Sequence, residues 1–207
     1  VCVHHPKVIR EPSVEKFKKG LTGVTIKNIL RRAKVLILEL SNGKSLVVHL
    51  KMTGQLVLRQ RTARDLKTKK RALLSISPER KKRVEGLIYS GKGKASRVSF
   101  YLSDGKILDF NDQRLFGELR LRDDWRTFKF IQGLGPEPFD LTPDKFKKML
   151  ENKRTKIKPL LMDQSFISGI GNLYASEILF RSKILPERPA NSLADKEKES
   201  LFKQARE

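Results

Sequence analysis

The sequence predicts an α+β protein, in which an N-terminal antiparallel β-sandwich-like domain (residues 1–132) is followed by a helical domain (residues 133–207). Three observations support this prediction. Apolar and polar residues alternate through much of the first part, the period of strands that bury one face. A proline-rich segment, residues 134–138, then interrupts the pattern because each proline removes a backbone donor and restricts the residue before it. Beyond this segment the apolar residues recur at helical spacing.

Two hairpins are predicted in the first domain. Residues 34–40 and 46–52 alternate around an Asn42-Gly43 turn, and residues 97–110 turn at Asp104-Gly105, both dipeptides that suit tight hairpins. Residues 118–122 have the composition of a further strand. The face that we expect to be buried in the first hairpin carries Leu36, Leu38, Leu40, Val48, Leu50 and Met52.

The segment between the hairpins is strongly basic. Residues 59–97 contain 14 Lys or Arg and three acidic residues, a net charge of +11. Its Ser-Pro and Gly breaks are typical of a long surface loop, which we interpret as a solvated insertion and not as a specific binding element.

The helical domain begins with a clear start signal. Thr142 is expected to cap a helix that has Pro143 at its first position, because proline has no N–H to satisfy there. A second helix is predicted over residues 156–163. Ser192 and Asp195 resemble a capping box for a last helix that ends near Ala205.

Two glycines precede the third predicted helix. Gly169 and Gly171 lie just before Asn172, a good N-cap for residues 173–181. Glycines before a helix start let backbone N–H groups approach an anion, and the helix dipole favours a phosphate there. An ordinary helix–turn–helix corner would have the same glycine spacing.

The charge indicates a polyanion as partner. Lys and Arg number 45 against 23 acidic residues, so the formal net charge is +22 and the pI is about 10.3, as in nucleic-acid-binding proteins. A ribosomal-type or merely soluble basic protein is the alternative. No stretch approaches the roughly 18 to 20 apolar residues of a membrane span, and no signal peptide is visible. One cysteine and three histidines allow no disulfide and no zinc spacing, so no metal is expected here.

Residues 156–186 resemble, nearly position by position, the helix-two-turn-helix of the formamidopyrimidine-DNA glycosylase (Fpg/Nei) family. The resemblance implies that Lys158 and Asn172 hold the phosphates that flank a lesion, while Gly169 and Gly171 present backbone donors. Tyr174 and Glu177 also match family positions, with packing and helix-internal bonding as the alternative.

The resemblance extends into the first domain. Residues 31–34, Arg-Arg-Ala-Lys, are similar to the family strand whose lysine reaches the active-site pocket and contacts a DNA phosphate. Lys34 is therefore the candidate catalytic and phosphate-binding residue, and a surface strand lysine is the alternative.

Two further segments resemble the loops that fill the gap left by an everted base. Residues 49–56 are similar to the family's His-Leu-Gly-Met-Thr-Gly segment and residues 112–117 to its Asp-x-Arg-Arg-Phe-Gly loop. A base must leave the stack before chemistry is done on it, and Met52, Arg114 and Phe116 suit the task of filling the vacancy. Met52 and Phe116 could otherwise be core residues. Lys51 stands where Gly is usual and Leu115 where a second Arg is usual.

The chain opens at Val1 in an apparent strand and has no Pro-Glu-Leu-Pro-Glu motif. We therefore expect both ends to be missing: the N-terminal proline, whose partly unprotonated amine is the family's nucleophile, with its adjacent glutamate, and a C-terminal zinc finger. The resemblance implies a bacterial-type, cytoplasmic, nucleoid-associated monomer, with no membrane association, that acts on double-stranded DNA containing an oxidised base or abasic site. The complete protein should excise oxidised purines and cleave the abasic strand by β,δ-elimination, while this segment alone should be inactive. An endonuclease VIII-like enzyme for oxidised pyrimidines and an inactive, non-specific DNA-binding relative are the alternatives.

Overall fold

The computed structural model describes residues 1–61, 65, 75–76 and 95–207. The chain divides into two compact units, Val1–Thr127 and Phe128–Glu207, which we describe separately. This division falls a few residues before residue 132, where the sequence places the boundary. The basic segment 59–97 lies largely outside the described residues.

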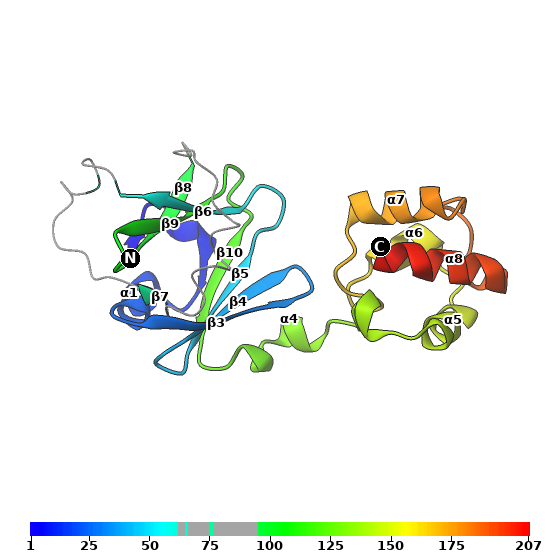
Figure 1. Ribbon diagram of the computed structural model, residues 1–207, viewed down its shortest axis with the longest axis horizontal. Coiled ribbons are helices and arrows are strands. Elements are labelled where there is room, and N and C mark those ends of the chain that lie inside the picture. Colours follow the sequence, from blue (N-terminus) through cyan, green and yellow to red (C-terminus); the bar gives the residue numbers. More distant parts are fainter. Residues whose placement is uncertain (62–64, 66–74, 77–94) are drawn as a thin grey trace. The chain divides into compact units, whose positions relative to one another are not determined.

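The first unit contains two β-sheets (Figure 1). One is four-stranded, in the order β1-β8-β9-β6, and the other is six-stranded, in the order β2-β10-β5-β4-β3-β7. Most neighbouring strands are antiparallel, as predicted, but β2 pairs with β10 and β7 with β3 in parallel. The strands are β1 (Cys2–Val3), β2 (Ile9–Glu11), β3 (Thr25–Arg32), β4 (Val35–Leu40), β5 (Ser45–His49), β6 (Gln55–Gln60), β7 (Ser75–Ile76), β8 (Ser96–Tyr101), β9 (Lys106–Asn111) and β10 (Glu118–Arg122).

One hydrophobic core joins the two sheets. Leu38, Val48 and Leu119 of the six-stranded sheet share a cluster with Phe100 and Phe110 of the four-stranded sheet, as expected of two sheets packed face to face. Helix α1 (Val14–Leu21) adds buried side chains to the same cluster. The described part of the unit also contains the short 3₁₀ helices η1 (Pro6–Val8) and η3 (Trp125–Thr127).

Both predicted hairpins are present, and so is the predicted strand β10. The first hairpin is shorter than expected: β4 begins at Val35, and β5 ends at His49. Lys34 and Met52 therefore lie in loops. Met52 is 72% exposed and does not belong to the buried face on which the alternation placed it.

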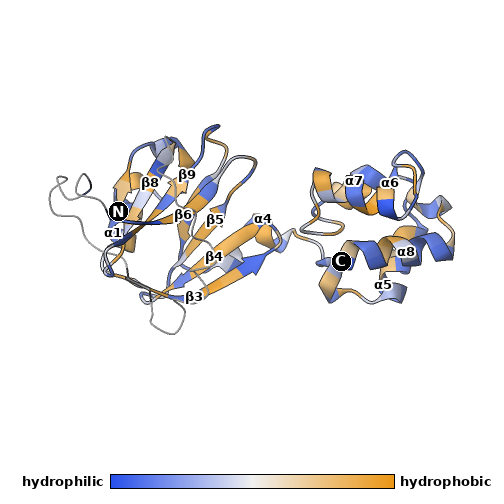
Figure 2. Ribbon diagram, turned by 45° about the horizontal axis from the view of Figure 1, so that its top comes forward, coloured by the Kyte–Doolittle hydropathy of each residue, from blue (hydrophilic) through white to orange (hydrophobic). Residues whose placement is uncertain are grey.

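The second unit is helical and has its own core. Its elements are α4 (Lys129–Gln132), η4 (Pro138–Asp140), α5 (Pro143–Glu151), α6 (Ile157–Met162), α7 (Asn172–Arg181), η5 (Ala190–Ser192) and α8 (Asp195–Arg206). Helices α5, α7 and α8 carry both apolar and polar residues (Figure 2), and their apolar side chains, such as Phe146, Leu179 and Phe202, meet in one cluster. This is the arrangement of helices with one buried face.

Helix starts in this unit follow the predictions in part. The Thr142 side chain accepts a hydrogen bond from the Lys145 N–H, with Pro143 next to it, as predicted. Asn172 is the first helical residue and Gly171 is the N-cap, so the predicted Asn172 cap is wrong. The predicted Ser192 cap is also wrong, because Ser192 ends η5. Helix α8 is capped instead by Glu197, whose carboxylate accepts the Ala194 N–H at 2.8 Å.

Candidate functional site

Two loops of the first unit are tied together by one buried carboxylate. Asp112, only 1% exposed, follows β9 and accepts hydrogen bonds from the Thr53 hydroxyl, from the Gly117 N–H at 2.6 Å and from the Arg114 N–H at 3.2 Å. Thr53 belongs to the loop after β5, whereas Arg114 and Gly117 belong to Asp112's own loop. The carboxylate therefore fixes the loops of residues 50–54 and 112–117 against each other.

Asp112 joins the two loops as an ionised carboxylate, which we call the brace. Burial alone raises the pKa of a carboxyl group, but the hydrogen bonds from Thr53, Gly117, Arg114 and Phe116 together hold the pKa of Asp112 below its ordinary value. It is therefore ionised at neutral pH. Hydrogen bonds to an ionised acceptor are stronger than neutral ones, so the loops have a strong common anchor.

The anchored loops bring together the three residues predicted to fill a vacated base position. The Arg114 guanidinium lies 3.3 Å from the Met52 Sδ and 4.6 Å from the centroid of the Phe116 ring. Met52 is 72% exposed and Phe116 47%, so neither is a core residue. The three side chains, which we call the plug, present an apolar and cationic surface to solvent.

The plug loops have left-handed backbone at two positions. Lys51 has φ 54° and Leu115 has φ 59°, a region that costs a residue with a Cβ free energy. These are the same two positions at which the sequence departs from the family pattern. Gly54, in contrast, has a steric reason to be glycine, since a Cβ there would meet the Leu50 carbonyl oxygen at 2.3 Å.

Lys34 lies near the plug loops, at one end of the six-stranded sheet. It occupies the two-residue turn between β3 and β4, where Arg32 pairs with Val35. In the adjacent strands Val35 pairs with His49, and His49 with Glu118. Partial burial lowers the pKa of Lys34 below its ordinary value.

His49 is a candidate site residue that sequence reasoning did not single out. Burial lowers its pKa to about 4, helped by the positive charges of Lys51 and Lys34 and opposed by Glu118. The Lys51 N–H donates to His49 Nδ1 at 3.0 Å, so the ring is neutral and carries its proton on Nε2. The available signal was its place on the polar face of a strand, directly before the plug loop.

In the second unit, the predicted phosphate-binding residues surround the start of α7. Gly169 has φ 97°, a left-handed conformation that favours glycine. Its N–H donates to the Gln164 side chain, which in turn donates to the Ile170 carbonyl. Gly171 caps α7 and Asn172 is exposed. The first N–H groups of a helix have no hydrogen-bond acceptor within the helix. This end of α7 therefore presents donors to an anion.

Lys158 shares a hollow with the later turns of α7. Lys158, Ser176 and Phe180 line one hollow of about 430 Å³, and Ser176 lies one turn after Asn172, to whose carbonyl its hydroxyl donates. The structure thus places a lysine of α6 beside the later turns of α7, and its joint action with the exposed start of that helix stays a prediction. Lys34 belongs to the other unit, so the expectation that all these groups share one surface stays a prediction.

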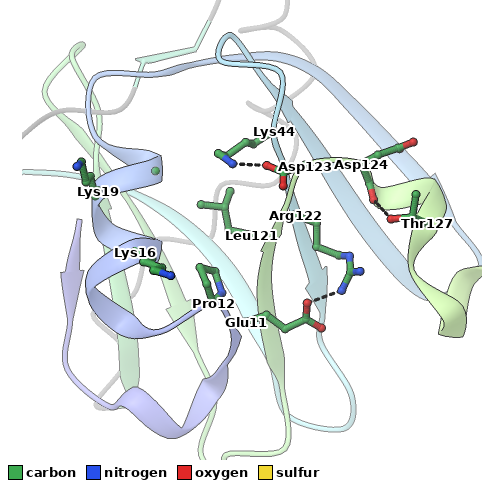
Figure 3. Close-up of a pocket in the computed structure, with 11 residues that line it drawn as sticks. Glu11, Pro12, Lys16, Lys19, Lys44, Leu121, Arg122, Asp123, Asp124 and Thr127 are labelled. Carbon is green, nitrogen blue, oxygen red and sulfur yellow. Dashed lines mark hydrogen bonds and ion pairs between the residues drawn. The ribbon is translucent and has the colours of Figure 1, made fainter.

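A separate hollow of about 640 Å³ in the first unit contains none of the predicted site residues. It lies beside α1 and the end of β10 (Figure 3), where Lys44 pairs with Asp123 and Arg122 with Glu11. Among the described residues, no group of three or more His, Cys, Asp or Glu is placed to hold a metal. No helix in the described part of the chain is long and apolar enough to span a membrane.

Comparisons with known proteins show the family to which the chain is similar. Residues 1–119 match the family model of the formamidopyrimidine-DNA glycosylase N-terminal domain, and residues 134–207 match that of the formamidopyrimidine-DNA glycosylase H2TH domain. The chain is 37% identical over 199 residues to the formamidopyrimidine-DNA glycosylase of Herpetosiphon aurantiacus, covering 95% of the chain and 63% of that protein. It is 36% identical over 209 residues to the enzyme of Pelotomaculum thermopropionicum, covering 98% and 65%.

A solved structure shows the same fold. The Lactococcus lactis Fpg, in complex with an abasic-site-containing DNA, matches with a TM-score of 0.78 and 26% identity, over 99% of this chain and 67% of that one. The chain spans just under two thirds of the length of the two curated relatives. Two family models together match most of its residues, and the chain belongs to the formamidopyrimidine-DNA glycosylase family.

Proposed function

We propose that this chain supplies the DNA-gripping and base-everting parts of a DNA glycosylase that removes oxidised purines, such as 8-oxoguanine and formamidopyrimidines. The observation that carries the proposal is the plug: three exposed side chains, of which Arg114 contacts both Met52 and Phe116, in loops held by the buried Asp112. Large exposed apolar side chains that are rigidly supported suit insertion between base steps.

Each plug residue has a separate task in this proposal. Met52, unbranched and flexible, fills the space that the everted nucleotide leaves. Arg114 offers guanidinium donors to the base that has lost its partner, and its stacking on Phe116 keeps its plane oriented. Phe116 wedges between neighbouring bases. Without such a plug the duplex would close again and the everted base would return.

The grip on the backbone comes from both units. Lys34 contacts a phosphate and reaches the catalytic pocket, while Lys158, Asn172 and the N–H groups after Gly169 and Gly171 hold the phosphates that flank the lesion. The support is the positive φ of Gly169 and the exposed start of α7, together with Lys158 beside the later turns of α7. The Lactococcus lactis neighbour was solved with DNA that contains an abasic site, which supports the same partner for this chain.

The chemistry that we propose for the complete protein is excision followed by β,δ-elimination at the abasic site. An N-terminal proline amine would attack C1′ of the damaged nucleotide and form a Schiff base, and a zinc finger would complete the DNA grip. Among the described residues, no group of three or more His, Cys, Asp or Glu could hold zinc. Residues 1–207 contain no Pro-Glu-Leu-Pro-Glu segment, so we expect them to bind and evert without forming the adduct.

Borohydride trapping on a duplex with one 8-oxoguanine tests the proposal. The complete protein should give a covalent adduct, and residues 1–207 alone should give none while still binding the duplex. Absence of the adduct with the complete protein would refute lyase activity and favour a non-catalytic DNA binder. A panel that includes oxidised pyrimidines separates the endonuclease VIII-like alternative, since faster excision of a pyrimidine lesion would overturn the purine assignment.

A further inference from the structure

Three cations surround one carboxylate beside the plug. Glu118 begins β10, opposite His49, and its oxygens lie 3.0 Å from Arg120 Nη2, 3.7 Å from Lys51 Nζ and 3.9 Å from Arg10 Nε. Its side chain is 22% exposed. Burial raises the pKa of Glu118, but Arg120, Lys51 and Arg10 outweigh it and hold the pKa below its ordinary value. Glu118 is therefore a carboxylate at neutral pH.

The three cations lie at different distances from the Glu118 carboxylate. Only Arg120 is within hydrogen-bonding distance of Glu118, since 3.7 and 3.9 Å exceed the range of an N–H···O bond. Arg120 also pairs with Glu11 at 2.5 Å, so its place in the sheet is fixed from two sides. The contact between the Lys51 ammonium and Glu118 is a longer ion pair, and both side chains are partly exposed. A partly exposed pair of this kind contributes little to stability, and exchanging its anion costs little.

Lys51 has a fixed backbone beside the plug. It has φ 54°, its N–H donates to His49 Nδ1 at 3.0 Å, and it directly precedes Met52. The start of the side chain is thus set beside the plug, while four methylene groups leave the ammonium able to move. A duplex that receives Met52 brings phosphates within reach of such a residue.

We propose, on the basis of the function proposed above, that Glu118 is an internal counter-ion that a DNA phosphate displaces from Lys51. In the free protein Glu118 holds the Lys51 ammonium over the sheet. When the plug enters the duplex, the ammonium turns to the backbone of the strand beside Met52 and adds a phosphate contact to that of Lys34. Arg120 keeps Glu118 paired in both states, so no buried charge is left alone.

Two charge-neutralising variants and two matched controls test this inference in the protein. Lys51→Asn removes the ammonium while keeping a residue that tolerates positive φ, and Lys44→Asn removes a lysine at the opposite end of β5 that pairs with Asp123. Glu118→Gln removes the counter-ion. Glu11→Gln removes an acid of the neighbouring strand β2 that pairs with Arg120 and Arg122.

Binding of a fluorescent abasic-site duplex is measured for each variant over a salt series. Lys51→Asn should reduce the slope of log K against log salt by about one unit, as expected for one lost phosphate contact, and Lys44→Asn should leave it within error. Glu118→Gln should tighten binding about two- to fivefold more than Glu11→Gln, the range expected of one partly exposed ion pair. In the Lys51→Asn background, this extra gain should disappear.

Two results would overturn the inference. One is a Glu118→Gln gain that equals that of Glu11→Gln or persists in the Lys51→Asn background, because either would show an effect of net charge alone. The other is an equal slope for Lys51→Asn and Lys44→Asn. A wild-type protein that binds no duplex would instead refute the proposed function, and the inference would fall with it. Lys51→Arg, which keeps the charge, should restore the slope and excludes a structural explanation.

Discussion

Replacing Asp112 with Asn tests the brace that holds the plug. The carboxylate accepts from the Thr53 hydroxyl and from the N–H groups of Arg114 and Gly117. An amide keeps one oxygen, but its NH₂ group must face a donor, so about half of these bonds are lost. Each hydrogen bond to a charged group contributes roughly 1.5–3 kcal/mol. We therefore expect Asp112→Asn to reduce the free energy of unfolding of the first unit by about 2–4 kcal/mol.

The single tryptophan makes this unit measurable by itself. Trp125 is the only Trp of the chain and lies within Val1–Thr127, where its Nε1 donates to Glu39 at 3.1 Å. Urea unfolding followed by Trp fluorescence should show the midpoint falling by about 1–2 M, given slopes of about 1–3 kcal/mol/M. Asp104→Asn is the control, since Asp104 is an exposed turn residue. Equal midpoints for the two variants would refute the brace.

The difference between wild type and Asp112→Asn should depend on pH. Because the pKa of Asp112 is lowered in the folded state, its contribution is fully present above the ordinary carboxyl pKa of about 4. The contribution is lost as the pH falls through the lower, folded-state pKa. The gap between the two unfolding free energies should therefore be constant from pH 5 to pH 7, shrinking only below about pH 4. A gap that shrinks already at pH 6 would contradict this assignment.

Four other substitutions test the phosphate contact, the plug and the loop geometry separately. Lys158→Ala should weaken binding to every duplex and reduce the salt slope by about one unit, and an unchanged slope would argue against a phosphate contact. Met52→Ala or Phe116→Ala should impair lesion processing far more than binding to undamaged duplex. Either change should alter the free energy of unfolding by only about 0.5 kcal/mol, because both side chains are exposed. Equal losses in processing and binding would mean that the two residues do not act as a plug. Gly54→Ala should lower the urea midpoint of the first unit, because the added Cβ would lie 2.3 Å from the Leu50 carbonyl oxygen, and a midpoint equal to that of wild type would show that the loop yields at low cost.

The strands were predictable where one face is buried. Leu38 and Leu40 belong to the core cluster and Leu36 packs against it, as the period of two in a strand predicts, while Ile37 between them is buried as well. The same rule failed at Met52. The left-handed turn at Lys51 interrupts the alternation, and a lysine there gives no sign of positive φ.

Helix starts were predictable where one side chain decides them. Thr142 followed by Pro143 leaves few alternative start positions for helix α5. At α7 and α8 the sequence offered Asn172 and Ser192 as caps, while the helices start after Gly171 and Ala194. Neighbouring residues compete for these positions, and packing shifts the choice by a residue or two.

The contacts that define the site depend on pairing between distant segments. Motif resemblance suggested that Met52, Arg114 and Phe116 act together. It gave no role to Asp112, the first residue of its motif, although the buried Asp112 carboxylate joins the two loops. The surroundings of Glu118 could not be predicted either. They follow from the pairing of β5 with β10, which brings Lys51 beside a residue far along the chain.

The departure at Lys51, where Gly is usual, has a physical meaning that sequence comparison alone does not give. Lys51 and Leu115 both carry a side chain at a left-handed position, each at a cost of roughly 1–2 kcal/mol. The free energy contributed by the Asp112 hydrogen bonds is large enough to offset that cost. These bonds also hold both loops in one conformation before DNA binds. A plug that is already ordered spends less binding free energy on ordering when it enters a duplex. A lysine at this strained position next to Met52 is explained if its charge contacts a DNA phosphate. The salt dependence of DNA binding by Lys51→Asn tests whether that contact exists.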